Sequence, residues 1–375
     1  MKILIGGSPC THWSIAQTKN RETEASGIGW ELFLNYRIAR DKYHPDYFLY
    51  ENNKSMSPAI RAQITAELGV EPVLINSTLV SAQNRQRLYW VGKREPDGTY
   101  SQVRVEQPED RGILLRGILE SDVCWREKGY ALKYRVYSPD GKSVTLCGNG
   151  EGVGAKTGLY AVPVPVNETV EGKAQCLRAT YYKDRIRNMV GNTVDRKTCV
   201  AMPVGMAAGP KSILVVTDAG KSVPVYEVRN GKIAIKGKEY PIKLTDGFYI
   251  IRKLTVTECK RLQTVPDTYA FPVSDTQAYK MLGNGWTVDV IAHIMNHFTG
   301  LTEEPVEVLS MYDGMSCGHI ALDKLGVDVT AYYATEIDKY AIQTTQHNFP
   351  DTVQLGDAFQ VRDEEWRPRR SEEAE

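Results

Sequence analysis

The sequence predicts an α/β fold, with a parallel or mixed sheet covered by helices on both faces and interrupted by a β-rich segment. Three observations support this prediction. Strands and helices alternate over residues 1–94, which is the pattern of strands joined by crossover helices. Residues 95–250 consist mainly of short β-runs separated by turn signals such as PDGK and RNGK. Residues 251–375 return to helices and strands.

The first part, residues 1–94, supplies four predicted strands and two predicted helices. KILIGG is the first strand, and WELFLNYRIARDKY is expected to be a helix. YFLYENN is the second strand, and SPAIRAQITAEL is the second helix, with Pro58 near its first turn, where proline is tolerated. VLINSTLV and RLYWVGK complete this part as two further strands.

The last part, residues 251–375, begins with two helical segments, LTVTECKRLQ and WTVDVIAHIMNHF. EEPVEVLSMYDGMSCGHIALDKLG then has the pattern of a strand, a glycine-containing turn and a helix. VTAYYATEID and TVQLGDAF are expected to be two more strands with acidic residues at their ends. The charged tail RDEEWRPRRSEEAE is expected to fray.

Composition indicates an ordinary soluble globular protein, because 42% of the 375 residues are hydrophobic and 25% are charged. No apolar run approaches the length of a membrane span, and the start MKILIGGSPC is too soon broken to be a secretory signal. Seven cysteines without a close CxxC pair argue against a disulfide framework and a structural zinc site. We therefore expect no metal, no membrane partner and a reducing cytoplasm.

The charge is unevenly distributed although the formal net charge is zero. Residues 95–253 carry 25 Lys and Arg against 18 Asp and Glu, and nearly all of this surplus lies in 165–253. Such a distribution suits a basic module that binds a polyanion, although an uneven, solvated surface would give the same count. The same two interpretations apply to a basic aromatic cluster in TYYKDRIRN, formed by Tyr181, Tyr182, Lys183, Arg185 and Arg187.

Three features of the last hundred residues together predict an adenosine-containing ligand. LSMYDGMSCG takes a strand into a turn that opens a helix, where backbone N–H groups can approach a ligand. Glu336, at the end of the next strand, can accept hydrogen bonds from both ribose hydroxyls. Asp357, one strand later, could accept one from the adenine amino group. The sequence has no phosphate-binding GxGxxG, and GAKTG is not a P-loop, so S-adenosyl-L-methionine is the expected ligand.

A second group of residues can meet at one edge of the same sheet. Cys10 ends the first strand, Glu51 ends the second, and Gln83, Arg85 and Arg87 lie in QNRQR before a later strand. A thiolate nucleophile, a carboxyl group and guanidinium groups make a coherent catalytic set. A single cysteine in this position is more often a buried structural residue, but the similar placement of Glu51 and Arg85 favours the nucleophile.

These motifs resemble those of DNA (cytosine-5) methyltransferases. The resemblance covers about 1–94 and 250–360 and rests on GGSPC, ENN, QNRQR, RKLTVTECKRLQ, GNGWTVDVI, MYDGMSCG, TEID and GDAF. Family members usually run from the cofactor motifs to the Pro-Cys nucleophile and then to a target-recognition domain. This chain begins at Pro-Cys and places the cofactor strands last, so it resembles a circularly permuted member of phage or bacterial type. Chain ends that lie close together at the surface make permutation tolerable.

The resemblance implies a Rossmann-like, S-adenosylmethionine-dependent methyltransferase sheet with an inserted β-rich target-recognition domain. Residues 1–94 would then be the catalytic half, residues 95–250 the target-recognition domain, and residues 251–375 the remainder with the cofactor motifs. The expected partner is double-stranded DNA, contacted in part by the basic aromatic cluster. A monomer is compatible with the sequence.

The resemblance also implies a reaction, in which Cys10 attacks C6 of a cytosine flipped out of the duplex. Glu51 would hold N3 and the exocyclic amino group, and Arg85 would support the base at its O2 or at a nearby phosphate. Arg87 is expected to be structural or to face a phosphate, and Gln83 belongs to the same motif. β-Elimination would then remove the C5 proton and free Cys10.

The cofactor residues follow from the same motifs. Glu336 would bind the ribose, Ile337 would pack on the adenine and Asp357 would bind its amino group. Asn284 and Val288 match a segment that closes the cofactor pocket, and Trp286 is as well explained by a core position. The residues expected at the methionine end are Tyr312, Asp313, Gly314, Met315 and Ser316.

The chain departs from the family pattern in several places, and rival functions remain. Asn53 replaces the valine of ENV, Thr11 replaces a frequent glutamine, and Ser316 and Cys317 stand where glycines are common. These changes are expected to alter pocket shape, target or rate. The alternatives are a tRNA cytosine methyltransferase, a nucleotide-level pyrimidine methylase, a catalytically inactive DNA-binding relative, and transfer of a group larger than methyl. A zinc deaminase is disfavoured because HxE and PCxxC are missing.

Overall fold

The computed structural model describes most of the chain, with gaps that fall mainly in its middle. The basic aromatic cluster at 181–187 lies outside the described residues. The described residues are 1–14, 21–120, 125–126, 136–137, 159–160, 164–166, 173–174, 176–177, 179, 199–204, 214–217, 222–235, 237–242, 244–252 and 254–368.

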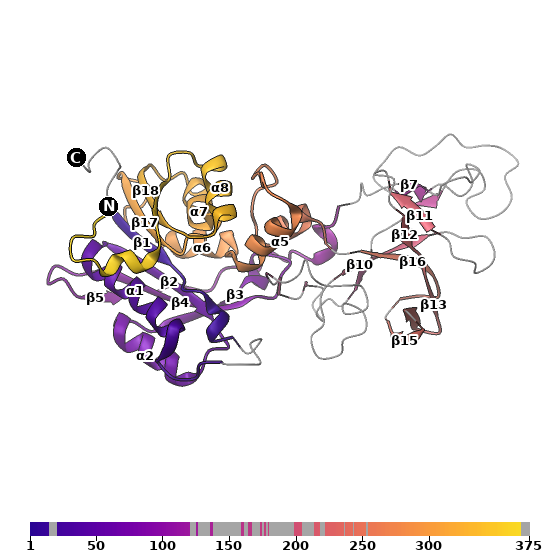
Figure 1. Ribbon diagram of the computed structural model, residues 1–375, viewed down its shortest axis with the longest axis horizontal. Coiled ribbons are helices and arrows are strands. Elements are labelled where there is room, and N and C mark those ends of the chain that lie inside the picture. The colour runs from indigo at the N-terminus through magenta and orange to yellow at the C-terminus, as the bar shows by residue number, and fades with distance from the viewer. Residues whose placement is uncertain are drawn as a thin grey trace, which may run out of the picture.

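A mixed sheet forms the centre of the molecule, with the strand order β19-β18-β17-β1-β2-β4-β3, and β5 pairs with β4 (Figure 1). The strands from β19 to β2 pair in parallel, whereas β4 runs antiparallel to both of its neighbours. The predicted α/β fold with a mixed sheet is therefore confirmed. The strands are β1 (Lys2–Gly6), β2 (Tyr47–Asn53), β3 (Pro72–Asn76), β4 (Gln86–Arg94), β5 (Tyr100–Gln102), β17 (Val306–Met311), β18 (Val329–Thr335) and β19 (Val353–Gly356).

Helices cover both faces of this sheet, because successive side chains of a strand point to opposite sides. Leu4 of β1 packs with α1 and α2, while its neighbours Ile3 and Ile5 pack with α6 and α7 on the other face (Figure 1). The helices are α1 (Gly27–Tyr43), α2 (Pro58–Leu68), α4 (Val256–Leu262), α5 (Asp275–Asn284), α6 (Val288–Met295), α7 (Cys317–Lys324) and α8 (Lys339–Asn348). Short 3-10 turns are η1 (Cys10–His12), η2 (Ser77–Leu79), η3 (Leu115–Gly117) and η6 (Ala358–Arg362).

Local side-chain bonds explain where several elements begin and end. Ser57 caps α2 by accepting a hydrogen bond from the Ile60 N–H at 3.2 Å, with Pro58 in the first helical turn. The segment VLINSTLV is not one strand. β3 ends at Asn76, whose side chain accepts from the Thr78 N–H at 3.2 Å and starts η2. The prediction of a strand over the whole segment is wrong for its second half.

Described strands between residues 120 and 254 pair in three smaller sheets, which lie at one end of the molecule beyond α5 (Figure 1). The larger of these has the order β15-β14-β13-β16-β10-β9, and the others join β12-β11-β6 and β7-β8. The strands are β6 (Trp125–Arg126), β7 (Val136–Tyr137), β8 (Leu159–Tyr160), β9 (Val164–Val166), β10 (Cys199–Val204), β11 (Leu214–Thr217), β12 (Ser222–Pro224), β13 (Tyr226–Arg229), β14 (Lys232–Ile235), β15 (Lys238–Pro241) and β16 (Gly247–Arg252).

The two ends of the described chain both pack on the central body. The Met1 amine donates a hydrogen bond to the Pro305 carbonyl at 2.8 Å, directly before β17. Near the other end, Arg362 Nε donates to Asn35 Oδ1 of α1 at 2.6 Å. None of the helices in the described part of the chain has the length and apolar character needed to cross a bilayer.

Candidate active site

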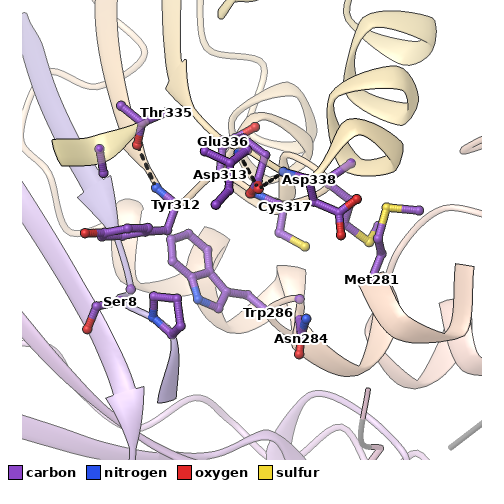
Figure 2. Close-up of a pocket in the computed structure, with 18 of the residues that line it drawn as sticks. Ser8, Met281, Asn284, Trp286, Tyr312, Asp313, Cys317, Thr335, Glu336 and Asp338 are labelled. Atoms are coloured by element: carbon purple, nitrogen blue, oxygen red, sulfur yellow. Dashed lines mark hydrogen bonds between the residues drawn. The ribbon is translucent and has the colours of Figure 1, made fainter. Parts of the chain in front are cut away.

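A cavity of about 500 Å³ lies where the parallel strands end at their carboxyl edge. Its walls come from the loops after β1, β17, β18 and β19, from the end of β2, and from the segment between α5 and α6. Figure 2 shows the part of this wall that faces α8. The cavity brings together eleven of the predicted site residues, namely Glu51, Arg85, Arg87, Asn284, Tyr312, Asp313, Gly314, Met315, Glu336, Ile337 and Asp357.

The carboxylate of Glu336 ties two of these loops together (Figure 2). Its Oε2 accepts from the Gly314 N–H at 2.8 Å, and its Oε1 accepts from the N–H groups of Ile337 and Asp338, each at 2.8 Å. Charge-assisted bonds of this kind fix the orientation of a carboxylate. The group is therefore held at the cavity wall before any ligand arrives.

The turn after β17 has a tight, left-handed backbone. Tyr312 and Ser316 have φ values of 62° and 56°, which non-glycine residues rarely adopt. Tyr312 is held from both ends, because its N–H donates to Thr335 Oγ1 at 3.0 Å and its hydroxyl donates to the Leu32 carbonyl at 2.7 Å. Strained backbone of this kind persists only where the surroundings enforce it, and it is common at binding sites.

Asp313 lies in this turn and accepts hydrogen bonds from the Tyr332 hydroxyl at 2.8 Å and from Ser316 Oγ. Burial raises the pKa of Asp313 to about 6, because a desolvated carboxylate is disfavoured. Ser316 itself is completely buried and does not line the cavity; its hydroxyl bonds Asp313 and Thr345. It therefore supports Asp313 rather than a ligand.

Two further cofactor candidates are placed for contact with a base. Ile337 is 74% exposed and forms part of the cavity wall, although an isoleucine is ordinarily buried. Asp357 also lines the cavity, and its Oδ1 accepts from the Phe359 N–H at 2.9 Å at the start of η6. An apolar side chain open to the cavity beside acceptors suits a flat ligand with an amino group.

The segment from α5 to α6 forms the opposite wall. Asn284 lines the cavity at the end of α5, whereas Val288 is fully buried in the core and does not reach it. Lys280 Nζ pairs with Asp338 Oδ2 at 2.6 Å, which links α5 to the first turn of α8. The sequence analysis missed this ion pair, because the two residues are separated by 58 positions and Lys280 belongs to no recognised motif.

The nucleophile candidate is placed by its backbone. Cys10 opens η1, and its neighbours Pro9, Thr11 and His12 line the cavity; the side chain of Cys10 lies outside what the structure describes. The preceding loop passes so close to β2 that a Cβ at Gly7 would lie 2.8 Å from the Glu51 carbonyl oxygen. Only glycine fits there, which explains the second glycine of the GGSPC motif.

Glu51 is almost fully buried, and both of its oxygens are engaged. Oε1 pairs with Arg87 Nε at 2.9 Å, and Oε2 accepts from Trp286 Nε1 at 3.1 Å. Trp286 is partly buried and lines the cavity between α5 and α6 (Figure 2). Each carboxylate oxygen has two lone pairs, so both retain capacity for a ligand.

The two arginines both line the cavity and bond other groups of the protein. Arg85, expected to support the base, uses its guanidinium on backbone carbonyls, at 3.0 Å from Leu177 O and 2.8 Å from Gly285 O. Arg87, expected to be structural or to face a phosphate, pairs with Glu51. The register of β2 and β4 explains this, because Arg87 lies opposite Asn53, diagonal to Glu51 on the same face.

Gln83 lies outside the cavity and is completely buried. Its Nε2 donates to the Leu262 carbonyl at 3.1 Å, and its Oε1 accepts from the Leu177 N–H at 2.7 Å. Ala174 also pairs with Gln83 in an isolated β-bridge. Gln83 therefore joins the middle part of the chain to the segment after α4 rather than contacting a ligand in the cavity.

Comparison with known proteins identifies the family. The model for C-5 cytosine-specific DNA methylases matches residues 1–299. The type II methyltransferase M.NlaX of Neisseria lactamica is 51% identical over 303 residues, covering 78% of this chain and 74% of the relative. M.HpaII of Haemophilus parainfluenzae is 25% identical (77% and 69%), and the orphan methyltransferase M.SPRI of Bacillus phage SPR is 24% identical (78% and 81%). The chain therefore belongs to the C-5 cytosine-specific DNA methylase family and is a DNA cytosine-5 methyltransferase.

Proposed function

We propose that this enzyme transfers the methyl group of S-adenosyl-L-methionine to C5 of a cytosine in a specific sequence of duplex DNA, through a covalent bond between Cys10 and C6. The observation that carries the proposal is the single cavity, which joins the loops of Glu336, Ile337 and Asp357 to those of Glu51 and Arg87. A methyl donor and an acceptor base bound there would lie side by side, which is what direct transfer requires.

The cofactor end of the cavity fits an adenosine. Glu336 has a preset carboxylate for ribose hydroxyls, Ile337 offers an uncovered apolar surface, and Asp357 offers an acceptor for an amino group. Tyr312, Gly314 and Met315 would lie along the methionine end. When bound, the group supplies an electrophilic methyl. The protein residues orient it and exclude water.

At the other end, the chain must activate a ring carbon that is a poor nucleophile. Addition of the Cys10 thiolate to C6 turns C5 into an enamine carbon, which can accept a methyl group. Glu51 would hold the base edge at N3 and the amino group, while Arg87 and Trp286 keep its carboxylate in position. The base has to leave the stack to reach this depth.

A circularly permuted order accounts for the position of the cofactor strands. The family match ends at residue 299, whereas β17, β18 and β19 follow it in sequence. In the sheet β17 pairs with β1, β18 pairs with β17, and β19 pairs with β18. Met1 lies against Pro305, and η6 packs on α1 through Arg362. We propose that the ends of this chain correspond to an internal connection in relatives of the usual order.

Residues 95–250 are proposed to select the DNA target. The segment carries a positive surplus, and its residues 174 and 177 bond Gln83 and Arg85 beside the cavity. Recognition would combine phosphate contacts with base contacts in the major groove.

The four described free cysteines are compatible with the reducing cytoplasm proposed for the protein; they are Cys176, Cys199, Cys259 and Cys317.

The test is transfer of labelled methyl groups from S-adenosyl-L-methionine to mixed-sequence duplex DNA, with Cys10→Ser alongside. We expect label in DNA that disappears with the variant, and bisulfite sequencing to place it at one short sequence. That sequence and its distribution would also distinguish a role in restriction–modification from self-protection of a phage genome.

Parallel reactions on tRNA and on free pyrimidine nucleotides test the rival substrates. Label in tRNA but not DNA would replace the proposed substrate, and cofactor binding without transfer would indicate a catalytically inactive DNA-binding protein. Mass spectrometry of the modified cytosine checks that the transferred group is methyl.

A further inference from the structure

We propose that His12 is the base that removes the C5 proton in the last step of the reaction. The inference rests on the proposed function, in which Cys10 bonds C6 and the methyl group enters at C5. His12 stands two residues after Cys10 in η1 and lines the same cavity. It belongs to none of the motifs that carry the family resemblance.

The geometry of the reaction restricts where this base can be. The Cys10 loop follows β1 and the cofactor loops follow β17, β18 and β19, and all of them line the cavity. In the proposed reaction the thiol and the methyl group add to opposite faces of the ring, so the methyl group enters on the face away from the thiol. The hydrogen that remains at C5 then points toward the Cys10 loop. A base that accepts this proton has to come from that loop and reach the cavity, since proton transfer needs hydrogen-bond distance.

Among the described residues that line the cavity, His12 best meets this condition. The carboxylates of Asp313, Glu336, Asp338 and Asp357 belong to the cofactor loops, and Glu51 is bonded by Arg87 and Trp286 at the edge of the base. Histidine suits the task because its ordinary pKa lies near neutral pH.

The surroundings of His12 are those of an oriented base. Its Nδ1 lies 3.6 Å from Glu22 Oε1, and its side chain remains 33% exposed. Glu22 is fixed in turn, because it accepts from Trp13 Nε1 at 3.0 Å and from the Gly29 N–H at 3.2 Å. A carboxylate beside one ring nitrogen leaves the other nitrogen for the substrate.

Gly29 leaves space for the side chains of His12 and Trp13. A Cβ at Gly29, in the first turn of α1, would lie 2.9 Å from the Cβ of His12 and 2.6 Å from Trp13 Nε1. Arg21 adds a second anchor, donating to the Trp13 carbonyl at 3.1 Å and to the Ser55 carbonyl at 2.6 Å. The segment bearing His12 is thus held against both α1 and the end of β2.

In the proposed step, the C5–H bond breaks and its proton moves to the free ring nitrogen of His12. The electron pair of that bond forms the C5–C6 double bond, and the C6–S bond breaks with its pair returning to Cys10 as thiolate. The products are 5-methylcytosine, free thiolate and imidazolium. The imidazolium then loses its proton to water, which the exposed part of the ring can reach.

The experiment compares His12→Gln with His347→Gln, which alters an exposed histidine of α8 outside the cavity. Glutamine keeps a polar side chain but accepts no proton at neutral pH. We expect turnover on duplex DNA to fall about 100-fold in the His12 variant, the usual contribution of a general base. A methylated protein–DNA adduct should accumulate on ordinary cytosine and persist in denaturing gels. Methyl transfer in a single turnover should stay close to wild type.

Duplexes with 5-fluorocytosine provide the control, because fluorine cannot leave as a proton and trapping reports only the earlier steps. His12→Gln should trap as fast as wild type, which also shows that the variant folds. Slower trapping would place His12 before methyl transfer, and turnover equal to that of His347→Gln would give it no part in the reaction. Either result overturns the assignment. Failure of wild type itself to trap would instead refute the proposed function.

Discussion

At the scale of single residues, the bond from Trp286 to Glu51 makes a tryptophan part of the site although its sequence position suggested a core residue equally well. Trp286→Phe keeps an aromatic ring, although a smaller one, and removes the N–H that the indole donates to Glu51 Oε2. A hydrogen bond to a charged group contributes about 1.5 kcal/mol, so we expect kcat/KM for DNA to fall about tenfold. Steady-state methylation measures it.

Trp366→Phe is the matched control, since Trp366 packs against the core near η6 and does not line the cavity. The affinity for S-adenosyl-L-methionine should change little in either variant, because the lost bond lies at the base end of the cavity. Equal rates for Trp286→Phe and Trp366→Phe would mean that Arg87 alone positions Glu51.

Much of the candidate site could be predicted from the sequence, because the residues of short motifs at strand ends meet at one edge of the sheet. The sequence could not predict which residues of the site face each other. Arg85 and Arg87 stand two positions apart in QNRQR, and only the register of β4 on β2 decides that Arg87 meets Glu51. Likewise, His12 follows Cys10 in sequence, but its neighbour Glu22 is identified only by the folded loop.

At the scale of elements, packing around His319 of α7 affects the protonation of its imidazole. Its ring stacks between Phe349 at 3.8 Å and Tyr332 at 4.4 Å, measured between ring centres. Burial lowers the pKa of His319 to about 4, from an ordinary value of 6.5. The neutral ring therefore stabilises the fold above pH 6.5, and this contribution is lost as the pH falls from about 6.5 to 4.

His319→Phe should remove that pH dependence while keeping the aromatic stack. Between pH 6.5 and 4, the free energy of unfolding of wild type should fall more than that of the variant, by at most about 3 kcal/mol. Urea denaturation at a series of pH values measures both. Parallel curves over the whole range would show that the pKa of His319 is the same in the folded and unfolded states.

The helix α4 offers a second test, because its first turn has a capping box. Thr255 Oγ1 accepts from the Glu258 N–H at 3.1 Å, and Glu258 Oε2 accepts from the Thr255 N–H at 2.8 Å. Thr255→Ala should lower the free energy of unfolding by about 1 kcal/mol. Ser274→Ala is the control, since Ser274 stands at the same position of α5 without a side-chain cap bond. Equal losses in the two variants would contradict the role of the cap.

The sequence predicted the elements with strong apolar patterns and missed those set by polar side chains. α8 was not predicted, since its sequence KYAIQTTQHN has few apolar residues and its start depends on Asp338, which accepts from the Tyr340 N–H at 3.0 Å. The end of β3 at Asn76 has the same kind of cause. These side-chain to backbone hydrogen bonds can be identified only in the folded structure.

At the scale of the whole molecule, the strand order explains how the two ends of the sequence build one cavity. β1 lies between β17 and β2, and the pairings of β18 with β17, of β17 with β1 and of β1 with β2 are all parallel. Alternating strands and helices predict such a sheet but not which strands are neighbours. The structure supplies that order, for example in the pairing of Lys2 with Glu307 at the start of β1.

The proposed permutation predicts that the chain can be cut elsewhere without loss of function. We expect a variant whose ends are joined by a flexible linker, and which is opened between Thr299 and Glu304, to fold and to methylate DNA like wild type. The new break lies beside the exposed residues 302–305 and interrupts the turn in which the Glu303 N–H donates to the Gly300 carbonyl at 3.0 Å. Every strand pairing of the central sheet remains. Surface turns of this kind accept new ends.

The control is a chain with the same linker opened inside α7, where a break would interrupt the buried face formed by Ile320, Ala321 and Leu322. Circular dichroism, cofactor affinity and methyl transfer would be measured on both. Folding and transfer by the first but not the second is the expected result, because the cavity depends on strand neighbours and not on where the chain begins. If the first chain does not fold or does not transfer methyl groups, although its linker is long enough to impose no strain, the result would contradict the prediction. It would show that folding requires the order in which the strands follow one another in the present chain.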